Sequence, residues 1–259
     1  MDQSHEHIFS SRNRFRYFDV VVAMYVTVLI ASNFIAASKV AKLGPFEFGA
    51  GILFFPFSYI FADVLTEVYG YAAARRCVWL GFAAMILTTV FAQVVLAFPP
   101  LPSWAHPPGT SIDRQAAWEI VFQYSWRLVP ASMAALWAGE MANNFVLSRM
   151  KLVTRGRWLW TRTVGSTVVG QLVDSLIFYP IAFLGVWTTE QVVTVMISNY
   201  VGKVLVEALF TPWTYLVVGW LKRVESYDAF DYGVDYNPFH VRFEYGRLPD
   251  EPSESGDPS

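Results

Sequence analysis

The sequence predicts an all-α membrane protein with six transmembrane helices, and three observations support this prediction. Of the 259 residues, 54% are hydrophobic and only 15% are charged, whereas soluble domains carry about 25% charged residues. Aromatic residues make up 17% of the chain and include ten tryptophans, which collect where transmembrane helices meet the membrane interface. Six stretches also reach the roughly 20 mostly apolar residues that one membrane-spanning helix needs.

These stretches and their flanks divide the chain into three parts. They cover residues 20–37, 49–69, 78–98, 120–147, 164–187 and 192–221. The segment 99–117 between the third and fourth stretches is rich in proline, which is typical of an extended loop. We therefore expect a cytoplasmic N-terminal tail (1–17), a six-helix transmembrane domain (18–223) and an acidic, mostly disordered cytoplasmic tail (224–259).

The distribution of Lys and Arg predicts the orientation of these spans. With the N-terminus in the cytoplasm, six spans place 14 of the 19 Lys and Arg residues on the cytoplasmic side and three outside. Basic residues are enriched in cytoplasmic loops. Both termini are therefore expected in the cytoplasm.

The C-terminal tail differs in composition from the rest of the chain. From Glu225 onward it holds nine acids and two arginines, and it ends in a run of Pro, Ser, Glu and Gly. Such a segment has too little apolar surface to form a core. We expect it to be solvated and dispensable, and a partner-binding role is the alternative.

Several function classes lack their sequence signatures. The chain has no Walker A loop, no GxGxxG after a strand, no HExxH and no GxSxG. Its single cysteine, Cys77, excludes an intrachain disulfide and a multi-cysteine metal site. The net charge of −2 gives no basic bias toward nucleic acid. We therefore expect no metal, no cofactor and no ATPase activity of the chain's own.

Seven ionisable residues fall inside the predicted spans. An ionisable residue at the centre of a lipid-facing helix costs about 2.5–3.5 kcal/mol. The summed cost of seven such residues exposed to lipid would exceed the free energy of unfolding of most proteins. We expect them to face one another, water or a ligand. They are Asp63, Glu67, Arg127, Glu140, Asp174, Lys203 and Glu207.

Spacing and depth separate these residues into groups. Asp63 and Glu67 are four residues apart and share a helix face, as do Lys203 and Glu207, which either form an intramembrane pair or contribute to a site. Glu67 either pairs with the arginines at 75 and 76 or has a functional role. Asp63 and Asp174 lie near mid-depth without a basic partner on their own helices, so they are the first candidates for a functional site.

Short motifs in a fixed order resemble the queuosine precursor transporter family, also described as a vitamin uptake family. They include Ser32-Asn33, Phe55-Pro56-Phe57, the run DVLTEVYG at 63–70, Ala74-Arg75-Arg76, Gly139-Glu140, Gly170-Gln171 and Asp174-Ser175. The resemblance covers about residues 18 to 223. It implies import of 7-deazaguanines such as preQ0 and preQ1, precursors of a modified tRNA base. It also implies a six-helix fold similar to the substrate-binding subunits of vitamin importers, in the bacterial inner membrane.

The chemistry of a deazaguanine suits the buried acids. Its guanine-like edge presents adjacent N–H donors, and a carboxylate accepts two parallel hydrogen bonds from such an edge. Flat rings also pack on aromatic faces, here offered by Phe57, Tyr59, Trp137 or Phe178. The expected substrate-binding residues are Asp63, Asp174, Gln171, Asn33, Asn143, Glu67 and Glu140, with Arg127, Lys203 and Glu207 as intramembrane charge partners.

Besides a transporter that works alone, we consider two other hypotheses for the function. The chain could be a substrate-capture subunit for another small vitamin-like heterocycle, with a separate energising module. An intramembrane enzyme would need an acid–base pair such as Asp63 with Asp174, but no histidine lies in any span, so we expect no enzyme. The expected partners are a small molecule and the lipid bilayer, with a homo-oligomer left open and no nucleic acid.

Overall fold

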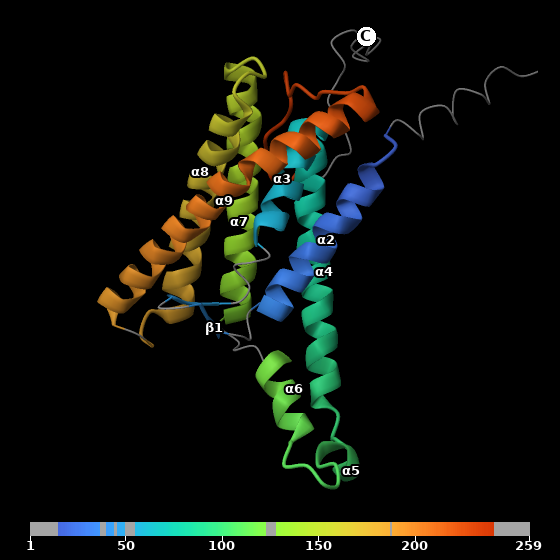
Figure 1. Ribbon diagram of the computed structural model, residues 1–259, viewed down its shortest axis with the longest axis vertical. Helices are drawn as coiled ribbons and strands as arrows, with labels where there is room; N and C mark the ends of the chain where they lie inside the picture. Colours follow the sequence, from blue (N-terminus) through green and yellow to red (C-terminus); the bar gives the residue numbers. More distant parts are fainter. Residues whose placement is uncertain are drawn as a thin grey trace, which may run out of the picture.

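The computed structural model describes residues 15–36, 40–43, 46–49, 55–122, 128–186 and 188–240. Six long helices dominate these segments, and successive ones run in opposite directions (Figure 1). Helices α7 and α8 pack along much of their length, and α9 contacts both α8 and α3. The six are α2 (Phe18–Ala36), α3 (Phe55–Tyr69), α4 (Tyr71–Ala97), α7 (Leu128–Val153), α8 (Leu159–Phe183) and α9 (Thr189–Glu225).

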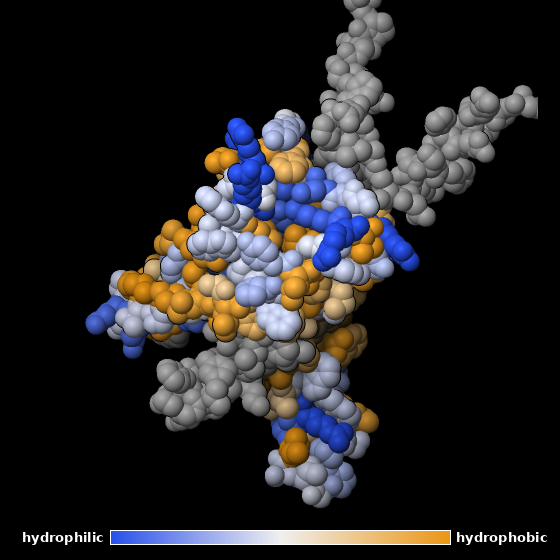
Figure 2. Space-filling model, turned by 45° about the horizontal axis from the view of Figure 1, so that its top comes forward, coloured by the Kyte–Doolittle hydropathy of each residue, from blue (hydrophilic) through white to orange (hydrophobic). Residues whose placement is uncertain are grey.

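The apolar surface identifies a membrane protein. Within the described segments, α4, α8 and α9 are long and apolar enough to cross a membrane, and α2 contains a shorter apolar stretch. Large apolar side chains stand exposed on α4 and α9, including Phe91, Val95, Leu205 and Leu209. In the view of Figure 2, hydrophobic residues cover much of the side of the molecule, and hydrophilic residues gather toward the top. Exposed apolar area on this scale marks contact with lipid or protein rather than water.

Several predicted boundaries are wrong for local reasons. The predicted second span begins at residue 49, but β1 (Val40–Leu43) and β2 (Phe46–Gly49) form an antiparallel hairpin there, and α3 starts at Phe55. The alternation of Phe46, Glu47 and Phe48 is typical of a strand. Helix α4 starts seven residues before the predicted third span, so the loop before it shrinks to Gly70. Its φ of 88° is one that glycine adopts without strain.

The predicted fourth span and the loop before it are also revised. The apolar stretch 120–147 contains the end of α6 (Arg114–Phe122) and most of α7, with 123–127 outside the described residues. The proline-rich segment 99–117 contains α5 (Pro102–Ala105) and the start of α6 rather than only extended chain. Figure 1 places α5 beyond the far end of α4 and α6 beside the last turns of α4.

Helix α9 begins at a well-defined cap. Thr188 Oγ1 accepts a hydrogen bond from the Gln191 backbone N–H at 3.3 Å, and the Gln191 side chain accepts one from Thr188 N–H at 3.1 Å. This reciprocal pair satisfies two N–H groups that the first helical turn leaves free. The 37 residues of α9 extend over about 55 Å at 1.5 Å per residue. That length exceeds the hydrocarbon thickness, so the helix can both span and project from the membrane.

The first part of the acidic tail packs against the helix bundle. Residues 226–240 turn back over the end of the bundle opposite α5 and α6 (Figure 1). Ala229 and Asp231 are buried there, and Ala229 N–H donates to Val68 O at 3.2 Å. The sequence suggested disorder because the tail has few apolar residues, but polar contacts with the helix ends hold this part. Residues 241–259 lie outside the described segments.

Candidate functional site

Two glycines bring α7 and α8 into backbone contact. A Cβ atom on Gly170 would lie 2.8 Å from Asn143 Cβ and 2.9 Å from Gly139 O, and one on Gly139 would lie 3.0 Å from Asp174 Cβ. Small residues let helix backbones approach closely in membranes. The same glycines place Glu140 and Asn143 of α7 beside Gln171 and Asp174 of α8, so the close approach builds part of the site.

Gly170→Ala is expected to destabilise the protein by about 1–3 kcal/mol, because the added methyl overpacks the α7–α8 contact. Thermal unfolding of the purified protein measures the change. Gly202→Ala in α9 is the matched control, since a Cβ atom there meets nothing within 4 Å. Equal unfolding temperatures for the two variants would contradict the close approach.

A cavity of about 220 Å³ with both apolar and polar walls lies among α2, α3, α7, α8 and α9. Its volume is below the roughly 300–1,000 Å³ of pockets for drug-sized ligands, which favours a compact ligand. Leu29, Leu136 and the aromatic rings of Tyr59, Phe178 and Tyr179 provide apolar walls. The polar side chains around the cavity are Ser32, Asn33, Ser58, Ser132, Glu140, Gln171, Asp174, Asn199 and Lys203.

An ion pair crosses this cavity between α8 and α9. Lys203 Nζ lies 2.9 Å from Asp174 Oδ2, and both side chains are 17% exposed. The sequence suggested that Lys203 pairs with Glu207. The structure shows no hydrogen bond between them, because no described residue hydrogen-bonds to either Glu207 carboxylate oxygen. The shared helix face holds, but the lysine stem reaches across to α8. A carboxylate and an ammonium thus face the same cavity.

Other cavity groups have hydrogen-bonding capacity left over. Among the described residues, no partner reaches Glu140 Oε2, Gln171 Oε1 or Ser58 Oγ. Asn33 uses its amide nitrogen on its own helix, donating to Leu29 O at 2.8 Å. Buried polar atoms are nearly always hydrogen-bonded in folded proteins. The unpaired atoms at the cavity are therefore positions where a polar ligand would gain bonds.

The predicted site residues separate into two sets. Asn33, Glu140, Gln171, Asp174 and Lys203 share the cavity. Asp63, Asn143 and Glu207 are buried but are absent from the cavity lining. Asn143 Nδ2 donates to Asp63 Oδ1 at 3.3 Å and links α7 to α3. Arg127 lies outside the described residues.

Sequence reasoning missed some cavity residues. Ser58, Ser132 and Tyr179 line the cavity but carry no charge, so the cost argument that selected the acids did not select them. Asn199 shares a helix face with Lys203, four residues on. That spacing was the available signal for Asn199.

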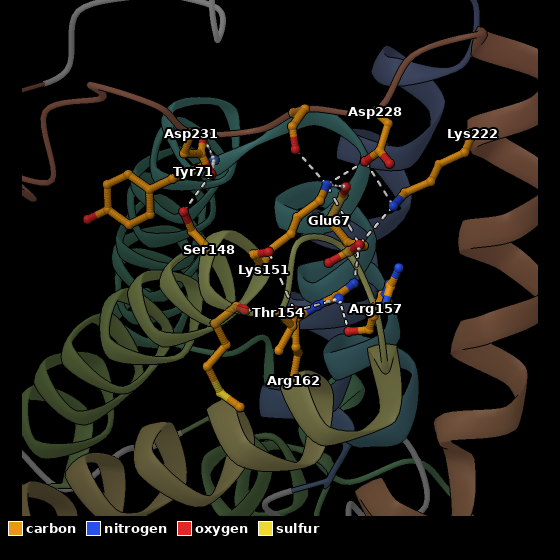
Figure 3. Close-up of polar contacts among 12 residues, drawn as sticks. Glu67, Tyr71, Ser148, Lys151, Thr154, Arg157, Arg162, Lys222, Asp228 and Asp231 are labelled. Atoms are coloured by element: carbon orange, nitrogen blue, oxygen red, sulfur yellow. Dashed lines mark hydrogen bonds and ion pairs between the residues drawn. The ribbon is translucent and has the colours of Figure 1, made fainter.

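Glu67 lies apart from the cavity, at the centre of an ionic cluster (Figure 3). Its Oε1 lies 2.6 Å from Arg162 Nη2, 2.7 Å from Lys222 Nζ and 3.6 Å from Lys151 Nζ. Arg162 and Lys151 are almost fully buried. Glu67 thus joins the ends of α3, α7, α8 and α9, which favours a structural role over the expected substrate contact.

The expected pairing of Glu67 with Arg75 or Arg76 is also replaced. Arg75 Nη1 donates to the backbone carbonyls of Asp235 and Asn237, both at 2.7 Å. Arg75 lies just past the chain reversal at Gly70, in the first turns of α4. Its side chain therefore holds the C-terminal segment.

Asp228 extends the ionic cluster into the C-terminal segment. Its Oδ1 lies 2.5 Å from Lys151 Nζ and 2.9 Å from Lys222 Nζ. Burial raises the pKa of Asp228, but the two lysine charges outweigh burial and hold this pKa below its ordinary value. The carboxyl is therefore ionised at neutral pH and links α7 to α9.

Asp231 supplies a cap for α4 from outside that helix. Its two carboxylate oxygens accept from the Tyr71 N–H at 3.0 and 3.1 Å, and Ser148 Oγ donates to Oδ2 at 2.5 Å. Burial raises the pKa of Asp231, and the bonds from Ser148 and Tyr71 offset part of that rise. A Cβ atom on Gly70 would lie 2.9 Å from Asp231 Oδ1. Glycine at 70 therefore allows both the turn and the cap.

Asp231→Ala is expected to cost about 1–2 kcal/mol of stability, the usual loss when a helix N-cap is removed. Thermal unfolding of the purified protein tests this. The matched control is Asp235→Ala, since Asp235 is exposed and pairs with His240 at the surface, where ion pairs contribute little. Equal stabilities for the two variants would show that Asp231 is not a significant cap.

Residues 49–217 match the family model described as "Putative vitamin uptake transporter". The chain belongs to this family. The matched range of this vitamin uptake family runs from the end of β2 into α9, so it includes every cavity residue except those on α2. The expected resemblance is confirmed.

Two curated relatives have names that specify a cargo. The chain is 35% identical over 154 residues to the "Probable queuosine precursor transporter" of Bacillus subtilis (strain 168), covering 59% of this chain and 64% of that protein. It is 25% identical over 206 residues to the "Queuosine precursor transporter" of Escherichia coli (strain K12), covering 78% of this chain and 86% of that protein. No solved structure matches the chain significantly.

Proposed function

We propose that this protein imports queuosine precursors, 7-deazaguanines such as preQ0 and preQ1, into the cytoplasm for tRNA modification. The observation that carries the proposal is the small cavity among membrane helices, with an acid–base pair and unpaired hydrogen-bonding atoms in its wall. Family membership supports a role in uptake, and the names of both relatives support this cargo. Transporters commonly place substrate sites near the bilayer midplane, between helices.

The cavity residues suit a flat, hydrogen-bonding ring. Asp174 and Glu140 offer carboxylate acceptors to the N–H donors of the guanine-like edge. Gln171 adds an amide whose oxygen has no partner among the described residues. The rings of Phe178 and Tyr179 give the heterocycle an aromatic surface. We assign substrate binding to Asp174, Glu140, Gln171 and Asn33, with Lys203 holding Asp174 until substrate arrives.

The proposed topology has six spans in the bacterial inner membrane with both termini in the cytoplasm. The alternating directions of the six long helices support this count (Figure 1), as does the excess of Lys and Arg on the proposed cytoplasmic side. The ionic cluster of Glu67 with Lys151, Arg162 and Lys222 then lies at the cytoplasmic end. A likeness to the substrate-binding subunits of vitamin importers is part of the same proposal.

A cysteine at Thr110 is expected to react with an impermeant thiol reagent added to intact cells, whereas one at Val153 is expected to react only after the cells are opened. Val153 is exposed at the end of α7, and the native Cys77 is buried, so background labelling is low. Labelling at 153 together with protection at 110 in intact cells would reverse the proposed orientation.

The cargo is tested by uptake of labelled preQ0 and preQ1 into cells that make queuosine only by import. We expect the gene for this chain to restore queuosine in tRNA, and the purified chain alone to exchange precursor across liposomes. If the chain exchanges precursor only after a separate energising module is added, the result would favour the alternative hypothesis of a substrate-capture subunit. Absence of precursor binding by the purified chain would refute the proposal.

A further inference from the structure

We propose that Asp63, Glu140 and Glu207 form a proton-binding site behind the cavity that couples proton entry to substrate uptake. The inference rests on the proposed function for its cargo. The three carboxyls come from α3, α7 and α9, and they are 0%, 7% and 0% exposed. Buried acids within transmembrane helices are the usual elements of proton pathways in transporters.

The hydrogen-bonding of these acids differs from that of the other buried acids in the spans. Both carboxylate oxygens of Glu207, Oδ2 of Asp63 and Oε2 of Glu140 have no partner in the part of the chain that the structure describes. Glu67 Oε2 also lacks a hydrogen-bond partner there, but Glu67 Oε1 has three cationic partners, and Asp174 has Lys203. Of the three, Glu207 is the one without a described partner on either oxygen, whereas Asp63 Oδ1 accepts from Asn143. A buried carboxylate without partners is so costly that the group binds a proton instead.

The three acids form one electrostatic unit. Asp63 interacts with both Glu207 and Glu140, and Glu207 interacts with Glu140. Tyr59 on α3 interacts with Glu140 and Glu207, and Tyr25 on α2 interacts with Glu140. Because negative charges repel one another in a low-dielectric site, the three carboxyls are not all ionised at once, and the cluster favours a bound proton.

The other charged and titratable groups around the three acids show how a bound proton could affect the substrate site. Asn143 from α7 donates one hydrogen bond to Asp63, and Cys77 from α4 is buried. Glu67, one helical turn along α3, also acts on Asp63, and Lys203, which lies 2.9 Å from Asp174 on α8, acts on Glu140. Glu140 interacts with both members of that pair and also lines the cavity. Glu140 therefore connects the cluster to the substrate site.

The coupling step needs no chemistry beyond proton transfer. A proton from outside binds a carboxylate of the cluster and forms one O–H bond, which makes that acid neutral. This removes a negative charge beside the Asp174–Lys203 pair and changes the field in which the substrate binds. Loss of the proton to the cytoplasm restores the carboxylate.

The test uses the full purified chain in liposomes with labelled preQ0, whose nitrile carries no charge. At one proton per substrate, an inward gradient of about one pH unit is expected to drive about tenfold accumulation, since one pH unit equals 1.36 kcal/mol. We expect Glu207→Gln to exchange preQ0 but to lose this accumulation. Asp63→Asn is the second variant, in case Glu207→Gln does not fold. The matched control is Glu190→Gln, an exposed acid of the same helix.

The outcomes separate this inference from the proposed function. Accumulation by Glu207→Gln and Asp63→Asn equal to wild type would overturn the proton site, and so would wild-type exchange that ignores the pH gradient. If wild type neither binds nor exchanges precursor, the proposed function fails, and infrared spectroscopy then decides the proton site. A carboxylic acid C=O band that titrates and weakens in Glu207→Gln would support it, and no such band would refute it.

Discussion

Glu67→Gln is expected to lower the stability of the protein by about 3–5 kcal/mol, the usual cost of leaving a buried charge without its partner. The variant keeps the size of the side chain but removes the one carboxylate that faces Arg162, Lys151 and Lys222. Arg162 and Lys151 are about 1–2% exposed as side chains, so water compensates little. Membrane abundance and the thermal unfolding temperature should both fall.

Two further variants make this prediction specific. Glu190→Gln removes an exposed acid from α9 and should leave stability unchanged. The double variant Glu67→Gln, Arg162→Gln should recover part of the loss, because it also removes the most completely buried cation. Glu67→Gln that is as stable as wild type but fails to bind precursor would instead return Glu67 to the substrate site.

Asp174→Asn is expected to weaken precursor binding roughly 10- to 100-fold. The change replaces an acceptor-only carboxylate by an amide with one acceptor and one donor group. Loss of a hydrogen bond to a charged acceptor costs about 1.5–3 kcal/mol, which gives that range of affinity. Binding of labelled precursor to purified protein measures it. Asp113→Asn, an exposed acid that can still cap α6 as Asn, is the control.

The ion pair with Lys203 allows a second explanation, which a double variant separates. If Asp174 only neutralises Lys203, then Asp174→Asn with Lys203→Met should bind precursor like wild type. If the carboxylate contacts the substrate, the double variant should bind as weakly as Asp174→Asn. Wild-type affinity in Asp174→Asn itself would remove Asp174 from the binding site.

Apolar length predicted the long helices because membrane burial leaves few alternatives for a run of 20 apolar residues. Apolar length could not place the helix boundaries. Gly70 ends α3 by its backbone conformation, and the pairing of β1 with β2 depends on a local alternation of apolar and polar residues. The cost of burial correctly indicated that the acids face inward. It could not tell which inward partner each acid meets, because Lys151, Arg162 and Lys222 come from three other helices.

Composition did not predict the contacts that the first part of the tail makes with the helix ends. Composition measures whether a segment can form its own core, and residues 226–240 cannot. They are instead held by groups that the helix ends leave unsatisfied, namely the free N–H of Tyr71 and the excess positive charge of Lys151 and Lys222. Such complementarity becomes visible only when the helix ends are brought together.

The position of Asp228 and Asp231 after α9 affects how the protein matures during synthesis. Both residues leave the ribosome after all six long helices, at about 5–20 residues per second. Until then, the lysines at 151 and 222 lack one acid, and the first turn of α4 lacks its cap. Arrival of the segment after α9 therefore completes this end of the bundle. A chain interrupted between Ser226 and Asp231 would reach the bilayer with its helices made but this end exposed to membrane proteases.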